Sequence, residues 1–226
     1  MTEAMGLRER KRERTRQAIS SAAISLFLAR GFDQVSVADI AAAAEVSKPT
    51  LFKYFASKEE LALHRIADHR EEAAEVVRRR PADLTPLAAL RRRFLDGLRA
   101  RDPVTGLNDH PEVLAYHRMI FSSPGLRAAV LLYTERDERA LADALGADRD
   151  AIVHADLIGD GDAAGAAMMT ARLAASQVVA VQRVLARENW RRLVDGRPAD
   201  EQYGDAVVAA DHAYDLLGRA YAGYYD

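Results

Sequence analysis

The sequence contains no cysteine among its 226 residues. This absence excludes a disulfide framework, a thiol nucleophile and any metal centre held by cysteine, and it favours a reducing compartment, so we expect a cytoplasmic protein. Long apolar runs are also missing, because the stretch with the fewest charges, residues 163–182, is interrupted by Thr170, Arg172, Ser176 and Gln177. We therefore expect no membrane span. No apolar segment follows the basic N-terminus, so we expect no signal peptide either.

Charge of one sign is not in excess, but it is unevenly distributed. The chain has 32 Lys and Arg against 34 Asp and Glu, and an apolar fraction of 49%, which argues against disorder. Residues 1–60 carry 10 basic and 8 acidic side chains, which leaves 22 basic and 26 acidic for residues 61–226. Within residues 8–16 there are six basic side chains and two acidic ones. This run is typical of an arm that binds a polyanion; a solvated first helical turn is the alternative.

Helical periodicity extends over most of the chain. Ile19, Ala22, Ala23, Leu26 and Phe27 have the spacing of one apolar helix face, and a glycine at position 31 is suited to end that helix. Capping residues and prolines mark the further helices that we expect: residues 37–44, 48–55, 58–80, 86–101, helices that begin at 111 and at 123–124, and helical stretches at 126–145, 163–194 and 200–222. Only residues 151–158 could form a strand. The sequence thus predicts an all-α fold.

Two domains are expected. Residues 1–60 form a three-helix unit with the basic arm at 1–16, and residues 61–226 form a larger helical bundle. In the first domain, helix 37–44 is followed by only Glu45, Val46 and Ser47 before helix 48–55. Such a tight connection forces a steep crossing with a small residue, Ala41, at the contact. This is the spacing of a helix-turn-helix, whose second helix fits the DNA major groove. An ordinary three-helix unit with a solvated face is the alternative.

The residues of this segment also carry a resemblance. Residues 15–61 resemble the DNA-binding domain of the tetracycline-repressor (TetR) family. The matching motifs follow in order: Gly31-Phe32, Val35-Ser36-Val37, Asp39-Ile40-Ala41, Ala44-Glu45-Val46-Ser47, Thr50-Leu51-Phe52-Lys53-Tyr54-Phe55 and Ser57-Lys58-Glu59. The family usually has glycine in the turn where this chain has Glu45. A non-glycine residue in a left-handed conformation costs on the order of 1 kcal/mol, so we expect either strain at this position or a shifted geometry of the turn.

The resemblance implies a homodimeric, ligand-released repressor that binds a palindromic operator in double-stranded DNA; an activator of the same fold is the alternative. It also implies a set of DNA-binding side chains: Lys48, Pro49 and Thr50 at the bases, Lys53 and Tyr54 at the groove and the backbone, and Ser36 and Lys58 at phosphates. The family pairs two copies through the last two long helices, here residues 163–194 and 200–222. Burial of these helices within one subunit is the alternative.

A small-molecule effector would need an apolar pocket with a few polar groups. The candidates in the second domain are Phe94, Leu98, Tyr116, Met119, Ile120, Phe121, Met168 and Trp190. Such residues at helical spacing can equally be plain core. Arg172 is the one charged residue between Asp162 and Arg183. If it is buried, it needs an acidic partner or an anionic ligand; otherwise it occupies the surface.

Other functions find weaker support. The glycines at 159, 161 and 165 follow an apolar run in the manner of a dinucleotide-binding turn, but the β-α-β context is missing. His110 and His117 could share a helix face, yet no carboxylate clearly completes a metal site. We therefore expect neither enzymatic activity nor a cofactor. Two rival hypotheses are a small-molecule-binding helical protein without DNA function and a nicotinamide-dependent enzyme.

Overall fold

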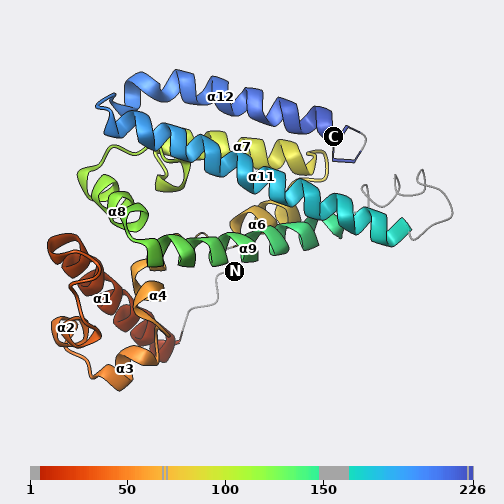
Figure 1. Ribbon diagram of the computed structural model, residues 1–226. Helices are drawn as coiled ribbons and strands as arrows, with labels where there is room; N and C mark the ends of the chain where they lie inside the picture. Colours follow the sequence, from red (N-terminus) through yellow and green to blue (C-terminus); the bar gives the residue numbers. More distant parts are fainter. Residues whose placement is uncertain (1–5, 68, 70, 148–162, 223, 226) are drawn as a thin grey trace. The chain divides into compact units, whose positions relative to one another are not determined.

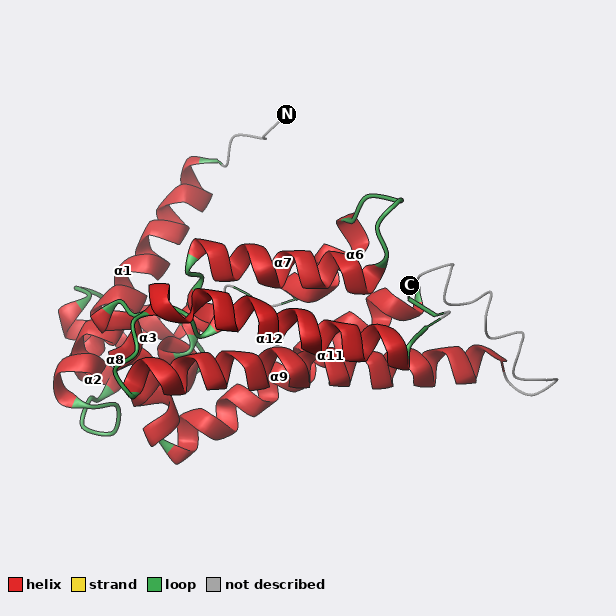
Figure 2. Cartoon of the chain, turned by 90° about the horizontal axis from the view of Figure 1, so that it is seen from above, coloured by secondary structure: helices red, strands yellow, loops and turns green. Residues whose placement is uncertain are grey.

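The computed structural model of the protein describes residues 6–67, 69, 71–147, 163–222 and 224–225. Within these residues all regular secondary structure is helical, as Figure 2 shows, which confirms the all-α prediction. None of the helices in this described part is long and apolar enough to cross a membrane. The chain divides into two compact units, Met1–Asp68 with Ala115–Leu131, and His69–Leu114 with Leu132–Asp226.

The first unit is built around a long N-terminal helix. Its elements are α1 (Leu7–Arg30), α2 (Val37–Ala43), α3 (Lys48–Phe52), α4 (Lys58–Ala62), α5 (His64–Ala67), and the adjoining parts of α8 (Pro111–Ser122) and α9 (Pro124–Gly146). Gly31 ends α1 with a φ of 86°, and its N–H donates to the Phe27 carbonyl at 2.8 Å, as predicted. Ile19, Ile40 and Leu51 have no exposed surface, so α1, α2 and α3 share one apolar core.

The predicted helix over residues 58–80 is wrong. The structure has three helices there: α4, α5 and α6 (Glu72–Arg79). At the end of α4 the Tyr116 hydroxyl donates to the Ala62 carbonyl at 2.7 Å, and at Glu71, whose φ is 57°, the N–H donates to Asp137 Oδ1 at 3.1 Å. Each of these two hydrogen bonds joins residues that are far apart in the sequence. Tertiary contacts therefore override the helical pattern of residues 58–80.

The second unit contains the long helices. Its elements are α6, α7 (Pro86–Ala100), the 3₁₀ helix η1 (Pro103–Thr105), the rest of α8 and α9, α11 (Ala163–Val194) and α12 (Ala199–Ala220). Helices α7, α11 and α12 run side by side (Figure 1). Thr85 caps α7 by accepting from the Ala88 N–H, as expected, and α11 has the predicted bounds. The possible strand at 151–158 and the turn that begins at 159 lie outside the described residues.

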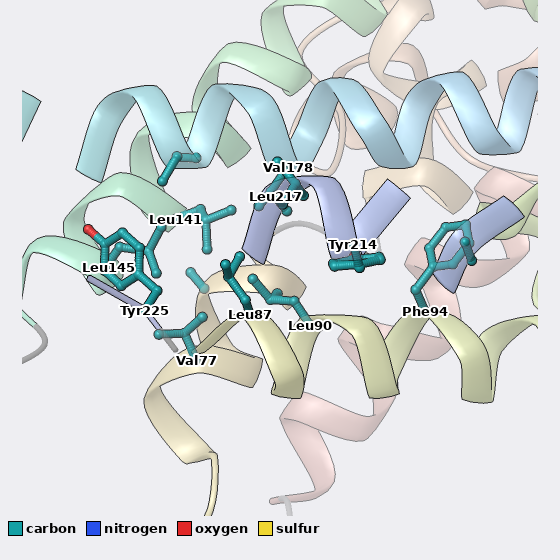
Figure 3. Close-up of a cluster of buried hydrophobic side chains, with 14 of the residues drawn as sticks. Val77, Leu87, Leu90, Phe94, Leu141, Leu145, Val178, Tyr214, Leu217 and Tyr225 are labelled. Atoms are coloured by element: carbon teal, nitrogen blue, oxygen red, sulfur yellow. The ribbon is translucent and has the colours of Figure 1, made fainter. Parts of the chain in front are cut away.

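Side chains from five helices form the core of the second unit (Figure 3). The ones drawn and labelled are Val77, Leu87, Leu90, Phe94, Leu141, Leu145, Val178, Tyr214, Leu217 and Tyr225. One close backbone approach joins η1 to α11. Gly106 has a φ of 71°, and a Cβ atom at this position would lie 1.9 Å from the Ala186 carbonyl oxygen. Only glycine fits there, for reasons of both backbone conformation and space.

A chain of charged groups crosses α6, α7 and the turn that follows α7. His69 Nδ1 lies 2.9 Å from Glu72 Oε2, the Arg93 guanidinium pairs with the other oxygen of Glu72, and Arg93 also reaches Asp102 at 2.8 Å. The hydrogen bond between His69 and Glu72 raises the pKa of His69 and lowers the pKa of Glu72. Each group therefore favours the charged form of its neighbour.

Stability should depend on pH through this pair. The raised pKa of His69 contributes stability that is complete below its ordinary value of 6.5 and is lost as the pH rises through the folded-state pKa. The lowered pKa of Glu72 contributes stability that is complete above 4.5 and is lost on acidification. Urea unfolding of wild type and His69→Gln should show a larger difference in unfolding free energy at pH 5.5 than at pH 8.5. An equal difference at the two pH values would contradict the assignment.

Candidate nucleic-acid interface

Helix α2 begins at a reciprocal cap. Ser36 Oγ accepts from the Asp39 N–H at 3.2 Å, the Ser36 N–H donates to Asp39 Oδ2 at 2.9 Å, and the hydroxyl donates to the same oxygen at 2.7 Å. The hydrogen bonds from the Ser36 backbone and side chain, with Arg30 nearby, hold the pKa of Asp39 below its usual value. Ser36 thus uses both of its donors within the cap. The structure offers no remaining donor for the phosphate contact predicted at this residue.

The turn between α2 and α3 has the hydrogen bonds of a Schellman motif. The Val46 N–H donates to the Ala41 carbonyl at 2.9 Å, and the Glu45 N–H donates to the Ala42 carbonyl at 3.1 Å. Glu45 has a φ of 54°, so it occupies the left-handed position of the motif, where glycine is usual. The strain expected at this residue from the sequence is therefore present in its backbone conformation.

Helix α3 is short and mostly exposed. Ser47 caps it by accepting from the Thr50 N–H at 3.2 Å, and the two hydroxyl oxygens lie 2.8 Å apart. Leu51 is fully buried, whereas Lys48 and Pro49 are exposed. The helix ends at Phe52 and not at Phe55 as predicted, because the Lys53 and Tyr54 N–H groups donate to the carbonyls three residues back, those of Thr50 and Leu51, so that the last turn tightens.

The three side chains after α3 differ in exposure. Lys53 is exposed, Tyr54 is half-buried, and Phe55 is buried beneath the Arg16 guanidinium, which lies 5.5 Å from the ring centroid. Phe52 was not among the predicted site residues, yet half of its surface is exposed. Phe52 lies three residues before the buried Phe55, which is the spacing of a shared helix face, so the sequence pattern gives no signal for an outward ring and its exposure is what identifies it.

Lys58 is engaged inside the first unit. Its ammonium donates to the Phe32 carbonyl at 2.9 Å and to the Val35 carbonyl at 3.2 Å, and it lies 4.1 Å from the centroid of the Phe32 ring. These contacts tie the start of α4 to the turn before α2. Lys58 therefore has a structural role, with one ammonium proton left for the phosphate contact expected from the sequence.

The basic arm is part of a helix. Residues 8–16 form the first turns of α1 and do not extend as a separate segment. Arg8, Arg10, Lys11, Arg12 and Arg14 are exposed on it. These charges therefore lie in fixed positions along the first turns of α1.

The predicted effector residues are divided between the two units. Tyr116, Met119, Ile120 and Phe121 belong to the first unit, while Phe94, Leu98, Met168, Arg172 and Trp190 belong to the second. In the first unit Tyr116 is bonded to α4 and Phe121 is exposed.

The members in the second unit also lie apart. Met168 and Trp190 both lie on α11, and a rise of about 1.5 Å per residue separates them by roughly 33 Å. They cannot line the same small-molecule pocket. Phe94 and Leu98 are buried core residues, and Arg172 is exposed, in agreement with the surface alternative.

A different set of residues lines a groove in the second unit, between α7 and α12. Its volume is about 510 Å³, and its lining includes Leu87, Arg91, Tyr214, Arg219 and Tyr225.

No cluster of three potential ligands that could hold a metal ion occurs among the residues that the structure describes. Burial lowers the pKa of His117, so the imidazole favours its neutral form.

Comparisons with known proteins agree with this geometry. Residues 19–64 match the model of the bacterial regulatory proteins of the tetR family. The chain is 35% identical to the HTH-type transcriptional regulator TcmR of Streptomyces glaucescens over 94% of its own length and 86% of the length of TcmR.

Solved structures show the same fold. NalD, the secondary repressor of the MexAB-OprM multidrug efflux pump in Pseudomonas aeruginosa, is 20% identical, with a TM-score of 0.55 over 92% of this chain and 96% of NalD. FadR from Bacillus subtilis, solved in complex with stearoyl-CoA, is 17% identical, with a TM-score of 0.50 over 89% of this chain and 96% of FadR.

A helix-turn-helix with an exposed second helix, joined to a helical bundle, defines a DNA-binding transcriptional regulator. The chain belongs to the TetR family of bacterial regulators, as its sequence indicates.

The left-handed Glu45 provides a test of the turn. Glu45→Gly should raise the free energy of unfolding by about 1 kcal/mol, because glycine adopts this conformation without a steric penalty. Glu45→Gln is the matched control, since it removes the charge but keeps the Cβ atom, and it should leave stability within about 0.5 kcal/mol of wild type. Equal effects of the two changes in urea unfolding would show that charge, and not backbone strain, matters at this position.

Proposed function

We propose that the protein is a homodimeric repressor that binds a palindromic operator and is released by a small-molecule effector. The observation that carries the proposal is the short helix α3, whose exposed Lys48 and Lys53 project from a rigidly capped turn. A helix of this kind enters the major groove, and a two-fold dimer places two copies about 34–36 Å apart, one helical turn of DNA. The protein would then act on DNA in the cytoplasm, without catalysis.

The proposed DNA contacts follow from exposure. Lys48, Pro49 and Thr50 would face the bases, and Lys53 and Tyr54 would lie at the groove edge and the backbone. The exposed cations of α1 would neutralise phosphates. We leave Ser36 out of this set, since its donors are used in the α2 cap, and we assign Lys58 mainly to holding the unit together.

We keep residues 1–60 as the DNA-contacting domain and residues 61–226 as the effector and dimerisation domain. Residues 115–131 would then belong to the second domain by sequence while packing in the first unit, where Tyr116 is bonded to Ala62. This arrangement would allow a change in the second domain to reach α4.

Two lysines separate the roles of sequence recognition and general attraction. Lys48→Gln should change the base preference at one position of each half-site, with a cost of about 1–3 kcal/mol against the preferred sequence. Lys11→Gln, on the exposed face of α1, should weaken binding to all duplexes alike and reduce the dependence of log K on log salt by about 1 per subunit.

The measurement is fluorescence anisotropy with promoter fragments from upstream of the gene and with a random duplex of equal length, at several salt concentrations. The absence of any difference between the two duplexes for wild type would contradict the proposed repressor. Identical behaviour of the two variants would contradict the role assignment alone.

The last two long helices carry exposed apolar side chains at helical spacing. On α11 they are Met169, Leu173 and Val184, and on α12 they are Val208 and Leu216, each more than half exposed. Within each helix their separations are close to whole numbers of helical turns, so they share a face. An apolar stripe of this kind on a helix pair fits a second copy of the same pair.

Charge placed in this stripe should separate the subunits. Leu173→Glu combined with Val208→Glu should shift the protein from dimer to monomer and weaken DNA binding at least tenfold, while the monomer stays folded because both side chains are exposed. Val104→Glu is the control, since Val104 is also an exposed apolar residue but lies on η1. Light scattering coupled to size exclusion measures the result, and a dimer that survives the double change would contradict this interface.

We place the effector in the second unit. There the Gln182 amide donates to the Tyr214 hydroxyl at 2.8 Å, and burial raises the pKa of Tyr214 to about 12, so this polar pair stays neutral within an apolar core. The groove between α7 and α12 leads to Tyr214. A compound that releases the DNA should protect amides of this unit from hydrogen exchange; protection confined to the first unit would contradict the placement.

A further inference from the structure

We propose that Phe52 determines sequence specificity by packing its ring against the methyl group of a thymine in each half-site. This inference rests on the proposed operator binding through α3. Phe52 is the last residue of α3, and half of its surface is exposed. The preceding residue, Leu51, has no exposed surface. A large ring left half exposed on the second helix of a helix-turn-helix is suited to a partner that covers it.

The surroundings of Phe52 favour DNA as that partner. Lys48 lies one helical turn earlier, on the same side of α3, and Lys53 follows directly; both are exposed. No acidic residue occurs between Glu45 and Glu59. An apolar ring between two exposed cations is complementary to a groove that is lined by phosphates. A protein partner would need acidic side chains on both sides of an apolar patch to match it.

The chemistry of the ring selects the base. Phe52 has no hydrogen-bonding group, so it can neither bind a phosphate nor read a donor or acceptor on a base edge. Among the groups displayed in the major groove, the thymine methyl is the apolar one, and phenylalanine is among the side chains that contact it. The Thr50 hydroxyl lies 2.8 Å from the Ser47 hydroxyl, and Phe52 is the exposed ring at the end of α3.

The test has two stages with the full-length chain. First, wild type and Phe52→Ala each select duplexes from a random-sequence library. Wild type should enrich a thymine at one symmetric position of both half-sites, and Phe52→Ala should accept any base at this position while the rest of the consensus is unchanged. Phe121→Ala is the matched control, because Phe121 is also an exposed phenylalanine of the first unit but lies on α8, and it should select the wild-type consensus.

Second, deoxyuridine replaces that thymine in the selected duplex, which removes the methyl group and leaves base pairing intact. Wild type should lose roughly fourfold in affinity for each half-site, the loss expected for one buried methyl. Phe52→Ala should bind the two duplexes equally, and Phe52→Leu should retain part of the discrimination.

The outcomes separate this inference from the function on which it rests. If wild type enriches no sequence at all, the proposed operator binding falls and this inference falls with it. If wild type enriches a consensus but Phe52→Ala enriches the same one, or if deoxyuridine leaves the affinity of wild type unchanged, only the role of Phe52 is overturned.

Discussion

The close approach of α2 to α3 depends on one residue held in a left-handed conformation. Glu45 reverses the chain at the end of α2, and the two hydrogen bonds back to Ala41 and Ala42 fix the direction in which α3 leaves. Ala41 is buried, so its small side chain permits the contact. If the φ of Glu45 left the positive region, these bonds would break and Lys48 and Phe52 would no longer face outward together. The surface that we propose for DNA binding thus depends on a single turn.

In the first unit, several serine hydroxyls and the Lys58 ammonium form hydrogen bonds that hold the helices around that turn. Ser36, Ser47 and Ser57 each accept an N–H at the start of a helix, and Lys58 gives two of its three donors to backbone carbonyls before α2. A recognition helix must be placed within a fraction of an ångström to read base edges. We infer that this need for position explains why Lys58 and Ser36, both expected at phosphates, also hold the scaffold.

The elements that the sequence predicted well are those set by short-range chemistry. A capping serine or threonine acts on an N–H three residues later, so the starts of α2, α3, α4 and α7 were readable. The break after α4 was not readable, because Tyr116 is 54 residues away from the Ala62 carbonyl that it bonds, and Asp137 is 66 residues away from Glu71. The sequence of residues 62–71 contains no local signal for the hydrogen bonds to Tyr116 and Asp137.

The same distinction separates the two candidate sites. The proposed DNA surface lies mainly on one short helix, so the residues of that segment alone indicate most of it, whereas Phe52 is identified by its exposure. An effector pocket draws its walls from several helices, and helical periodicity predicts which side chains are buried but not which buried side chains meet. Met168 and Trp190 share a helix yet lie too far apart, whereas Tyr214 and Gln182 meet from different helices. Any such pocket therefore depends on how α7, α11 and α12 pack, which is tertiary information that no single segment contains.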